Sequence, residues 1–356
     1  MFLAWQEIKH SKSRYIMVIA LMFLITYLVY FLTGLAYGLA QSNRTAIDKW
    51  DADQILLAKD VNASLRQSMI PAEDADSVEV SGKKAGISQK SAVIQSEGLE
   101  EKVNVNYLGI DFDGFVAPNI VEGNKVKADK EVIADLSLKE EEGLSIGDEL
   151  TMTGNDTKLK VVGFTDNAQL SVVPVIYMNQ DTFRSVMEIP LREDMPTPLN
   201  GVVVRGETTE YDKEKLDLIS IEDFIEALPG YSAQNMTFIF MIVFLMVIAA
   251  VVIGIFMYIL TMQKTQIFGV MKAEGISSSF ISKSVICQTA ILALIGIVIG
   301  SLATYGTSIV LPAAVPFEIN NQFMLLASGM MFIVAIIGAL FSVVTIAKID
   351  PLDAIG

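Results

Sequence analysis

The sequence has only one cysteine, Cys287, and one histidine, His10. A single cysteine cannot form a disulfide within the chain, so any domain outside the cell must be stabilised by its own apolar core. The lone histidine and cysteine are far apart in the sequence and offer no catalytic constellation. We therefore expect a protein that is not itself an enzyme, with no catalytic residues and no metal site.

A phosphate-binding loop of the form G-x-x-x-x-G-K-[ST] is also missing. The pair Gly82-Lys83 is followed by Lys84 and lacks the upstream glycine. Without that loop the chain cannot hold ATP in the usual way. Any ATP-driven activity therefore requires a motor on a separate polypeptide.

Charge is absent from four long stretches. No Asp, Glu, Lys or Arg occurs in residues 15–40, 227–263, 284–317 or 319–347. A bilayer core of about 30 Å needs roughly 20 apolar residues as helix, whereas helices of soluble proteins average about 11 residues. The first stretch is also longer than the ~7–15 residue core of a signal peptide. We expect four transmembrane helices near 15–40, 236–262, 286–311 and 322–347.

Basic residues beside these spans predict their orientation. Cytoplasmic loops are enriched in lysine and arginine. The loop between the third and fourth spans has neither, while basic residues precede the first span and occur between the second and third: Lys9, Lys12, Arg14, Lys264, Lys272 and Lys283. We expect a multi-pass protein of the cell membrane with a cytoplasmic N-terminus (1–40 with the first span), a cytoplasmic loop (263–285), the last spans in 286–347, and a cytoplasmic C-terminus (348–356).

Residues 41–235 are then extracellular and strongly acidic. They hold 19 of the 26 basic residues and 36 of the 41 acidic ones, a net charge of −17, which excludes nucleic acid as a partner. The pattern of this segment predicts an α+β domain. Strand patterns occur at 157–164, 173–178 and 201–206, a strand and an acidic helix within 131–143, and a further helix is capped by Ser220 and Asp223. Helical spacing continues through 34–50, so the first span is expected to project as a stalk.

A short amphipathic helix is expected in the cytoplasmic loop, within "QIFGVMKAEGIS" (266–277). Ile267, Val270 and Met271 fall on one face at helical spacing, Gly275 can end the helix, and Ser277 or Ser278 can cap the next. Such a helix can rest among lipid headgroups. It can equally dock into a groove of a soluble partner, with its apolar face as the anchor.

The order of several motifs resembles a known family. The layout of one span, a large outer domain and three further spans combines with "QIFGVMKAEGIS", "EGLSIGDELTM" followed by "KLKVVGF", and "KIDPLDAIG" at 348–356. Over nearly the whole chain this pattern is similar to the FtsX/MacB superfamily of ABC-transporter permeases. The segments "SRYIMVIALMFLI", "TGLAYGL" and "PAAVPFEIN" resemble its haem-exporting branch in Gram-positive bacteria. The resemblance implies a MacB-like (type VII) permease.

This resemblance also implies partners and sites. The loop helix becomes a coupling helix that contacts an ABC ATPase subunit through Gln266, Phe268, Gly269, Lys272, Glu274 and Gly275. The ending "DPLDAI", with Asp350 as cap and Pro351 at the first helical position, implies a second cytoplasmic contact. We expect a permease homodimer, surrounded by membrane lipid, with two ATPase subunits that bind ATP-Mg; the chain has no intrinsic cofactor.

Haem is the cargo that the branch implies, and its iron needs axial ligands in an apolar slot. The residues placed for this role are Tyr37, Tyr231, Gln234 and Met236. The branch implies a glutamate close to position 234, where this sequence has glutamine. In the alternative interpretation, the tyrosines anchor the chain at the membrane interface and the methionine packs within its span.

Three functions follow from the sequence. The first is export of haem or another amphipathic molecule, with ATP-driven motion transmitted mechanically to the outer domain. The second is export of an antimicrobial peptide, lipid or antibiotic by the same motion. The third is a non-transporting signal device that controls an extracellular hydrolase.

Overall fold

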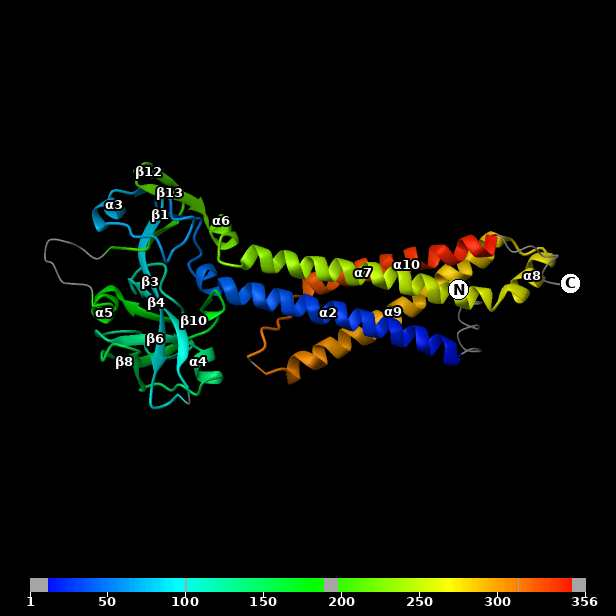
Figure 1. The fold of residues 1–356 in the computed structure, drawn as a ribbon, viewed down its shortest axis with the longest axis horizontal. Coiled ribbons are helices and arrows are strands. Elements are labelled where there is room, and N and C mark those ends of the chain that lie inside the picture. The colour runs from blue at the N-terminus through cyan, green and yellow to red at the C-terminus, as the bar shows by residue number, and fades with distance from the viewer. Residues whose placement is uncertain (1–11, 100, 189–197, 313, 348–356) are drawn as a thin grey trace. The chain divides into compact units, whose positions relative to one another are not determined.

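The computed structural model describes residues 12–99, 101–188, 198–312 and 314–347. The chain divides into two compact units (Figure 1). One, here called the helical unit, comprises Met1–Gly38 and Asn235–Gly356, and the other, the sheet unit, comprises Leu39–Gln234. His10 and the C-terminal segment with Asp350 and Pro351 lie outside the described residues.

Four long helices dominate the helical unit, and one short helix lies between the second and the third of them. Each long helix is apolar and long enough to cross a membrane, which confirms the prediction of four transmembrane helices. Residues 34–48 are helical, as the predicted stalk requires. The helices are α2 (Lys12–Asp48), α7 (Tyr231–Met262), α8 (Thr265–Ala273), α9 (Ser278–Val310) and α10 (Asn321–Ala347).

Glycines allow α9 to lie directly against α2. A Cβ added to Gly296 would lie 2.5 Å from Cβ of Met22, and one added to Gly300 would lie 2.9 Å from the Thr26 side chain. Small residues four apart let two membrane helices approach closely and gain dispersion contacts. The same device joins α10 to α7, where Gly338 lies against the backbone at Ala250.

The sheet unit is built on an eleven-stranded sheet, with a second sheet of β12 and β2. The main path runs β13-β1-β11-β3-β4-β10-β6-β8-β5; β7 pairs with β3 and β8, and β9 pairs with β10. The strands are β1 (Gln54–Ala58), β2 (Glu79–Val80), β3 (Lys83–Gln95), β4 (Val103–Ile110), β5 (Glu122–Gly123), β6 (Glu131–Asp135), β7 (Glu149–Met152), β8 (Lys158–Thr165), β9 (Gln169–Leu170), β10 (Val173–Asn179), β11 (Gly201–Arg205), β12 (Thr208–Glu210) and β13 (Leu216–Ser220).

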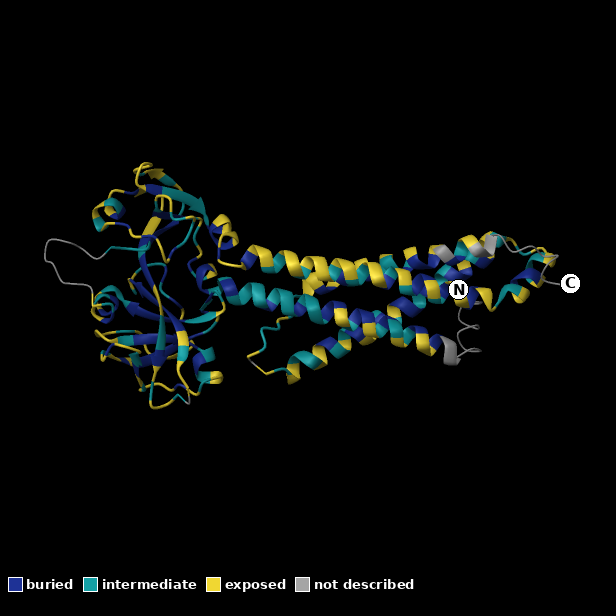
Figure 2. Ribbon diagram, in the orientation of Figure 1, coloured by how far each residue is buried: buried dark blue, intermediate teal, exposed yellow. Residues whose placement is uncertain are grey.

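The longest strand, β3, joins the two halves of the main sheet. Its first part pairs with β11, from Lys83 to Ile87, and its second part pairs with β4, from Ser88 to Ile94. Most pairs are antiparallel, but β10 runs parallel to β4 and β8 parallel to β6. The central strands are buried, as Figure 2 shows in dark blue, so the unit has the apolar core that a domain without disulfides needs.

Four short helices complete the sheet unit: α3 (Ala72–Asp76), α4 (Ser137–Glu140), α5 (Gln180–Val186) and α6 (Ile221–Glu226). The predicted cap of α6 is confirmed, because the Ser220 hydroxyl accepts a hydrogen bond from the Asp223 amide at 3.0 Å. The expected strands at 157–164, 173–178 and 201–206 are confirmed as β8, β10 and β11. The α+β prediction for this unit is therefore confirmed.

Candidate coupling site and ligand site

The short helix α8 has sharply defined ends. Glu274 ends it, and Gly275 follows with a φ of +90°, a conformation that glycine adopts without the strain of a Cβ. The Ser277 side chain then accepts a hydrogen bond from the Phe280 amide and caps α9. The two glycines of the motif thus have separate roles, since Gly269 lies buried within α8 and Gly275 makes the turn.

The two faces of α8 differ in burial. Phe268 is only 2% exposed and packs in the apolar core of the helical unit, where Met271 joins it one turn later. Ile267 is 57% exposed and Val270 is 46% exposed. Ile267, Val270 and Met271 recur at the predicted helical spacing, but their burial differs, because Met271 is half-buried beside Phe268 while Ile267 and Val270 are exposed.

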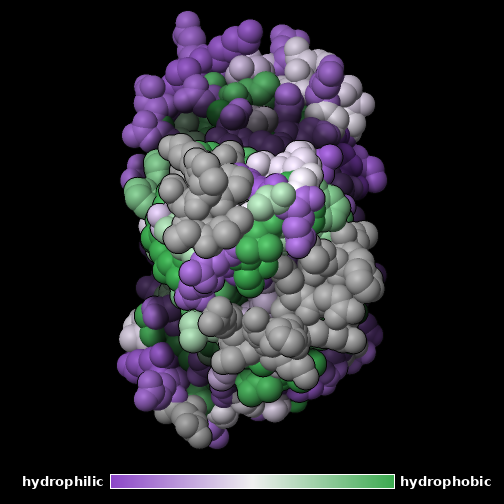
Figure 3. All heavy atoms as spheres, turned by 90° about the vertical axis from the view of Figure 1, so that its right-hand side faces the viewer, coloured by the Kyte–Doolittle hydropathy of each residue, from purple (hydrophilic) through white to green (hydrophobic). Residues whose placement is uncertain are grey.

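The six residues expected to contact an ATPase therefore fall into two groups. Gln266, Glu274 and Gly275 are exposed and Lys272 is half-buried, whereas Phe268 and Gly269 are buried inside the chain. The exposed stripe of α8, defined as Ile267, Val270 and Glu274, follows the spacing i, i+3, i+7 of a single helix face. Figure 3 views the end of the helical unit that carries α8, where hydrophobic and hydrophilic surface lie side by side.

A hydrogen-bonded chain links the base of α8 to two long helices. The Lys264 ammonium donates to the Tyr15 hydroxyl at 2.7 Å and lies 5.3 Å from the centre of that ring. The Tyr15 hydroxyl donates to Oε1 of Gln288 at 3.1 Å. Tyr15 and Gln288 are both buried, so the connection from α8 to α2 and α9 lies inside the unit. No sequence pattern predicted this link, because the three residues lie far apart along the chain.

The four residues expected to bind cargo occupy different environments. Tyr37 is half-buried on α2, where its ring lies 5.5 Å from that of Phe323. Tyr231 is 9% exposed and packs in the core of the sheet unit. These contacts give Tyr231 a structural role within its unit.

Gln234 and Met236 follow Tyr231 on α7. Gln234 lies one turn after Tyr231, and its buried amide nitrogen has no hydrogen-bond partner in the part of the chain that the structure describes. Met236 is 62% exposed and belongs to the helical unit. Of the four candidates, Tyr37 and Met236 therefore lie in the helical unit, and Tyr231 and Gln234 in the sheet unit.

The described part of the α9–α10 loop after residue 313, residues 314–320, packs on α2. The Phe317 ring stacks on Phe31 with 5.4 Å between centroids, at the end of a row of stacked rings on α2. A Cβ at Gly34 would lie 2.5 Å from the Phe317 ring. Glycine at position 34 therefore makes the notch that this ring fills.

The backbone of the same loop follows α2 for a further turn. The Glu318 amide donates to the Gly34 carbonyl at 3.2 Å. A Cβ at Gly38 would lie 2.4 Å from the Pro316 carbonyl oxygen. Because two glycines four residues apart accommodate the loop, its position against α2 is closely specified.

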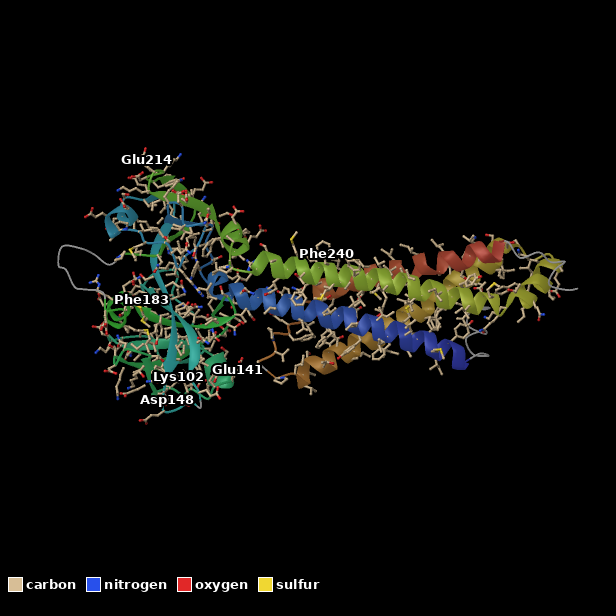
Figure 4. The ribbon with its side chains drawn as sticks, viewed as in Figure 1. Lys102, Glu141, Asp148, Phe183, Glu214 and Phe240 are labelled. Carbon is tan, nitrogen blue, oxygen red and sulfur yellow. The ribbon has the colours of Figure 1, made fainter. Side chains whose placement is uncertain are left out.

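The sheet unit has an open polar cleft of about 620 Å³, and Asp148, Glu149 and Lys158 line its wall. Lys158 and Glu149 form an exposed ion pair at 2.6 Å, and Asp148 is labelled in Figure 4. None of the predicted ligand residues lines this cleft. Within the described ranges, no group of three or more His, Cys, Asp or Glu side chains is placed to hold a metal ion.

Comparison with known families identifies the helical unit. Residues 239–351 match the family model described as "FtsX-like permease C-terminal". This range takes in most of α7 and the whole of α8, α9 and α10. This part of the chain is therefore similar to an FtsX-like permease domain. The exposed stripe of α8 lies within the matched range, between α7 and α9.

Relatives align along the whole length of this chain. It is 28% identical over 362 residues to "Putative hemin transport system permease protein HrtB" of Staphylococcus epidermidis, covering 100% of this chain and 99% of the relative. It is 25% identical over 359 residues to the protein of the same name in Staphylococcus haemolyticus, with the same coverage. The periplasmic region of MacB from Actinobacillus actinomycetemcomitans overlaps 48% of this chain and 90% of its own, with 11% identity and a TM-score of 0.35.

Proposed function

We propose that this FtsX-like permease is the membrane subunit of an ATP-driven ABC exporter of haem or another amphipathic molecule. A separate ATPase subunit docks on the exposed stripe of α8 from the cytoplasm. The observation that carries this proposal is the division of α8 into a buried anchor, Phe268, and an exposed stripe of Ile267, Val270 and Glu274. A helix fixed on one face and open on the other is suited to bind a groove.

The orientation in the membrane is part of the proposal. Lys264, Lys272 and Lys283 surround α8, whereas the α9–α10 loop has no basic residue. The positive-inside rule then favours α8 and both termini in the cytoplasm and residues 41–235 outside. An ATPase that binds ATP-Mg can reach α8 only from the cytoplasmic side.

Movement of α8 is transmitted through the buried hydrogen-bonded chain. Lys264 at the base of α8 holds Tyr15 near the start of α2. Helix α2 continues without interruption to Asp48, where its last turns belong to the sheet unit: the Asn43 and Ser42 carbonyls accept hydrogen bonds from the amides of residues 171 and 172 at 2.9 and 3.0 Å. A displacement of α8 is thereby transmitted mechanically along α2 (mechanotransmission).

A homodimer with two ATPase subunits is the proposed assembly. Helix α7 is the least covered of the long helices, since 17% of its most apolar window is buried, against 33–39% for the other three. Phe240 projects from it, as Figure 4 shows, and is 62% exposed. This face meets lipid or the α7 of a second copy, and a two-fold assembly would present one α8 to each ATPase subunit.

Haem enters as cargo through the names of the staphylococcal relatives. The same movement could export a peptide, lipid or antibiotic instead. In a signal device the movement would change the sheet unit without transport of any cargo. Stimulation of the ATPase in the reconstituted complex by haemin favours haem export. Stimulation by a lipid or peptide instead favours the second candidate, and capture of a hydrolase by the sheet unit favours the third.

Docking is tested by reversing one charge on α8. Glu274→Lys should reduce co-purification of the co-expressed ATPase subunit at least tenfold, because the exposed carboxylate at the helix end sets the register of the partner. Gln263→Lys is the matched control, since it adds the same lysine at an exposed position just before α8. Equal ATPase recovery with both variants would contradict docking on α8.

A further inference from the structure

Strand β3 is paired in two separate stretches, one on each of its edges. It pairs with β11 from Lys83 to Ile87 and with β4 from Ser88 to Ile94. In the described chain, no residue of β3 pairs with both strands. The first half of the main sheet, defined as β13, β1 and β11, therefore meets the second half, defined as β4, β10, β6, β8 and β5, at the step from Ile87 to Ser88. In Figure 1, β1 and β13 lie on one side of β3, and β6 and β8 lie on the other.

The apolar cores on the two faces of this sheet differ. On the face that carries the last turns of α2, a single core includes Val203 of β11 and Leu108 of β4. On the opposite face the two halves have separate cores, since Val202 belongs to one cluster and Tyr107 to another. Close packing resists displacement within each core. The halves are thus held together on the α2 face, whereas a bend at β3 would separate the opposite faces without disrupting a shared core.

Two side-chain amides bridge the halves at this step. Gln180, which follows β10, donates from Nε2 to the carbonyl oxygens of Gly109 at 2.8 Å and of Gly86 at 3.4 Å. Asn200, which precedes β11, accepts a hydrogen bond at Oδ1 from the Gln89 amide at 2.7 Å. Gly86 is paired with β11 and Gln89 with β4, so each amide side chain reaches across to the other half. Side-chain hydrogen bonds therefore take the place of the backbone ladder on both edges of β3 where its pairing changes.

The step itself is buried and polar. Ser88 is fully buried and Gln89 is 4% exposed. Nε2 of Gln89 donates to Oδ1 of Asn106 at 2.9 Å, but its Oε1 has no hydrogen-bond partner in the part of the chain that the structure describes. A buried acceptor without a partner raises the free energy of the folded arrangement, and an apolar side chain at this position would avoid that cost. The sheet is therefore less stable locally at this step than in its apolar cores.

Helix α2 is attached to the second half at the turn between β9 and β10. Two consecutive amides of this turn, at Ser171 and Val172, donate to carbonyl oxygens of α2 at 2.9 and 3.0 Å. Both residues have left-handed φ values, +53° and +64°, which is unusual for valine because its branched Cβ is crowded there. Such a conformation persists only where surrounding contacts impose it. The contact with α2 therefore holds the turn in this conformation.

We propose that residues 87–89 of β3 form a hinge within the sheet unit, held closed by Gln180 and Asn200. The last turns of α2 hold the second half through the turn at Ser171 and Val172, whereas α6 directly follows β13 of the first half and leads to the start of α7. A displacement of α2 relative to α6 then bends the sheet at the hinge. The shared core stays in contact, and the separate cores on the opposite face move apart. The hinge requires neither cargo nor an ATPase, so it goes beyond the proposed function and is tested apart from it.

Hydrogen exchange of the full-length chain in lipid nanodiscs, without the ATPase, tests whether the step opens. Asn200→Ala removes the acceptor of the Gln89 amide, so residues 86–90 should exchange about tenfold faster, the effect of losing one hydrogen bond. Exchange in β6 and β8 should not change, because these strands lie away from the step. Asn155→Ala is the matched control: its Nδ2 donates to the Val186 carbonyl at 2.9 Å within the second half, and its loss should leave residues 86–90 unaffected. Equal acceleration in β6 and β8, or none at residues 86–90, would overturn the proposal.

Spin-label distances test the bending itself, in a Cys287→Ser background that removes the only native thiol. Lys102→Cys and Glu214→Cys place labels on exposed residues of the second and first halves, which lie at opposite ends of the sheet unit in Figure 4. Addition of Asn200→Ala should broaden this distance distribution. The same substitution should leave the distribution between Lys102→Cys and Lys125→Cys unchanged, because both of these labels belong to the second half.

The second bridge gives an independent variant. Gln180→Met removes the hydrogen bonds to Gly86 and Gly109 and keeps a side chain of similar length. It should broaden the distribution across the halves even where Asn200→Ala is not obtained as a folded protein. An unchanged width across the two halves, or equal broadening of both label pairs, would overturn the hinge.

Discussion

At the scale of single residues, burial decides which side chains serve structure and which can meet a partner. Phe268 and Ile267 are neighbours on α8, yet one is 2% exposed and the other 57% exposed. Their apolar character alone could not distinguish them in the sequence. The direction of each depends on the surface offered by α2, α7 and α9, which is a property of the folded unit.

These neighbours give a matched pair of substitutions. Phe268→Ala should destabilise the helical unit by about 3 kcal/mol, because it leaves a cavity where the ring packs. Ile267→Ala should leave stability within about 0.5 kcal/mol, as expected of an exposed side chain, but should weaken ATPase co-purification. Thermal unfolding in detergent and pull-down of the ATPase measure the two effects. Equal thermal stability of the two variants would show that α8 is not anchored by Phe268.

A second residue-scale prediction concerns Asp135 in the sheet unit. Its carboxylate is buried and accepts a hydrogen bond from the Ala168 amide at 2.7 Å. Burial raises the pKa of Asp135 above its ordinary value, although hydrogen bonds from Ser137 and Ala168 oppose that shift. Because the folded pKa is the higher one, protonation favours the folded state, and the stability due to this group is lost as pH rises through the folded pKa.

Asp135→Asn removes this titration. The free energy of unfolding of the variant, relative to the unaltered chain, should therefore increase from pH 4 to pH 7. Denaturant titrations at each pH, followed by the fluorescence of Trp50 in the sheet unit, measure the difference between the two proteins, so that carboxylates common to both cancel. A difference that is constant with pH, or that falls, would show that Asp135 is not perturbed as described.

At the scale of elements, the sequence predicted most helices and the strongest strands. Uninterrupted apolar stretches predicted the four long helices, and the alternation of apolar and polar residues predicted β8, because both signals are local. The pairing of β3 with β11 could not be predicted in the same way. These two strands, Lys83–Gln95 and Gly201–Arg205, are far apart in sequence, come together through packing of the whole unit, and no local pattern encodes the partner. The notch of Gly34 and Gly38, like the link from Lys264 to Tyr15, depends on such distant neighbours.

Helix contacts through glycine give the element-scale prediction. Gly300→Leu should destabilise the helical unit by about 1–3 kcal/mol, because its side chain would collide with Thr26 and the α2 backbone, which has little room to move. Gly306→Leu is the matched control on the same helix, with no atom within 4 Å of an added Cβ. Melting temperatures in one detergent compare the two. A larger loss for Gly306→Leu would contradict the close contact of α9 with α2.

At the scale of the whole molecule, the chain combines a helical unit with four apolar helices long enough to cross a membrane and a charged α+β unit. Charge is concentrated in residues 41–235 and nearly excluded from the long helices, so one chain has a hydrated part and a part that lipid can surround. This segregation was readable from the sequence. The identity of the cargo was not, since cargo recognition depends on a few side chains that meet only in the folded chain.

The central claim is that α8 faces the cytoplasm and receives an ATPase there. It is tested most directly by labelling Glu274→Cys with a membrane-impermeant thiol reagent, in a Cys287→Ser background that removes the only native thiol. The account predicts labelling in inside-out vesicles and none in intact cells, with strong protection by the co-expressed ATPase. Labelling in intact cells, or unchanged labelling in vesicles that carry the bound ATPase, would contradict it.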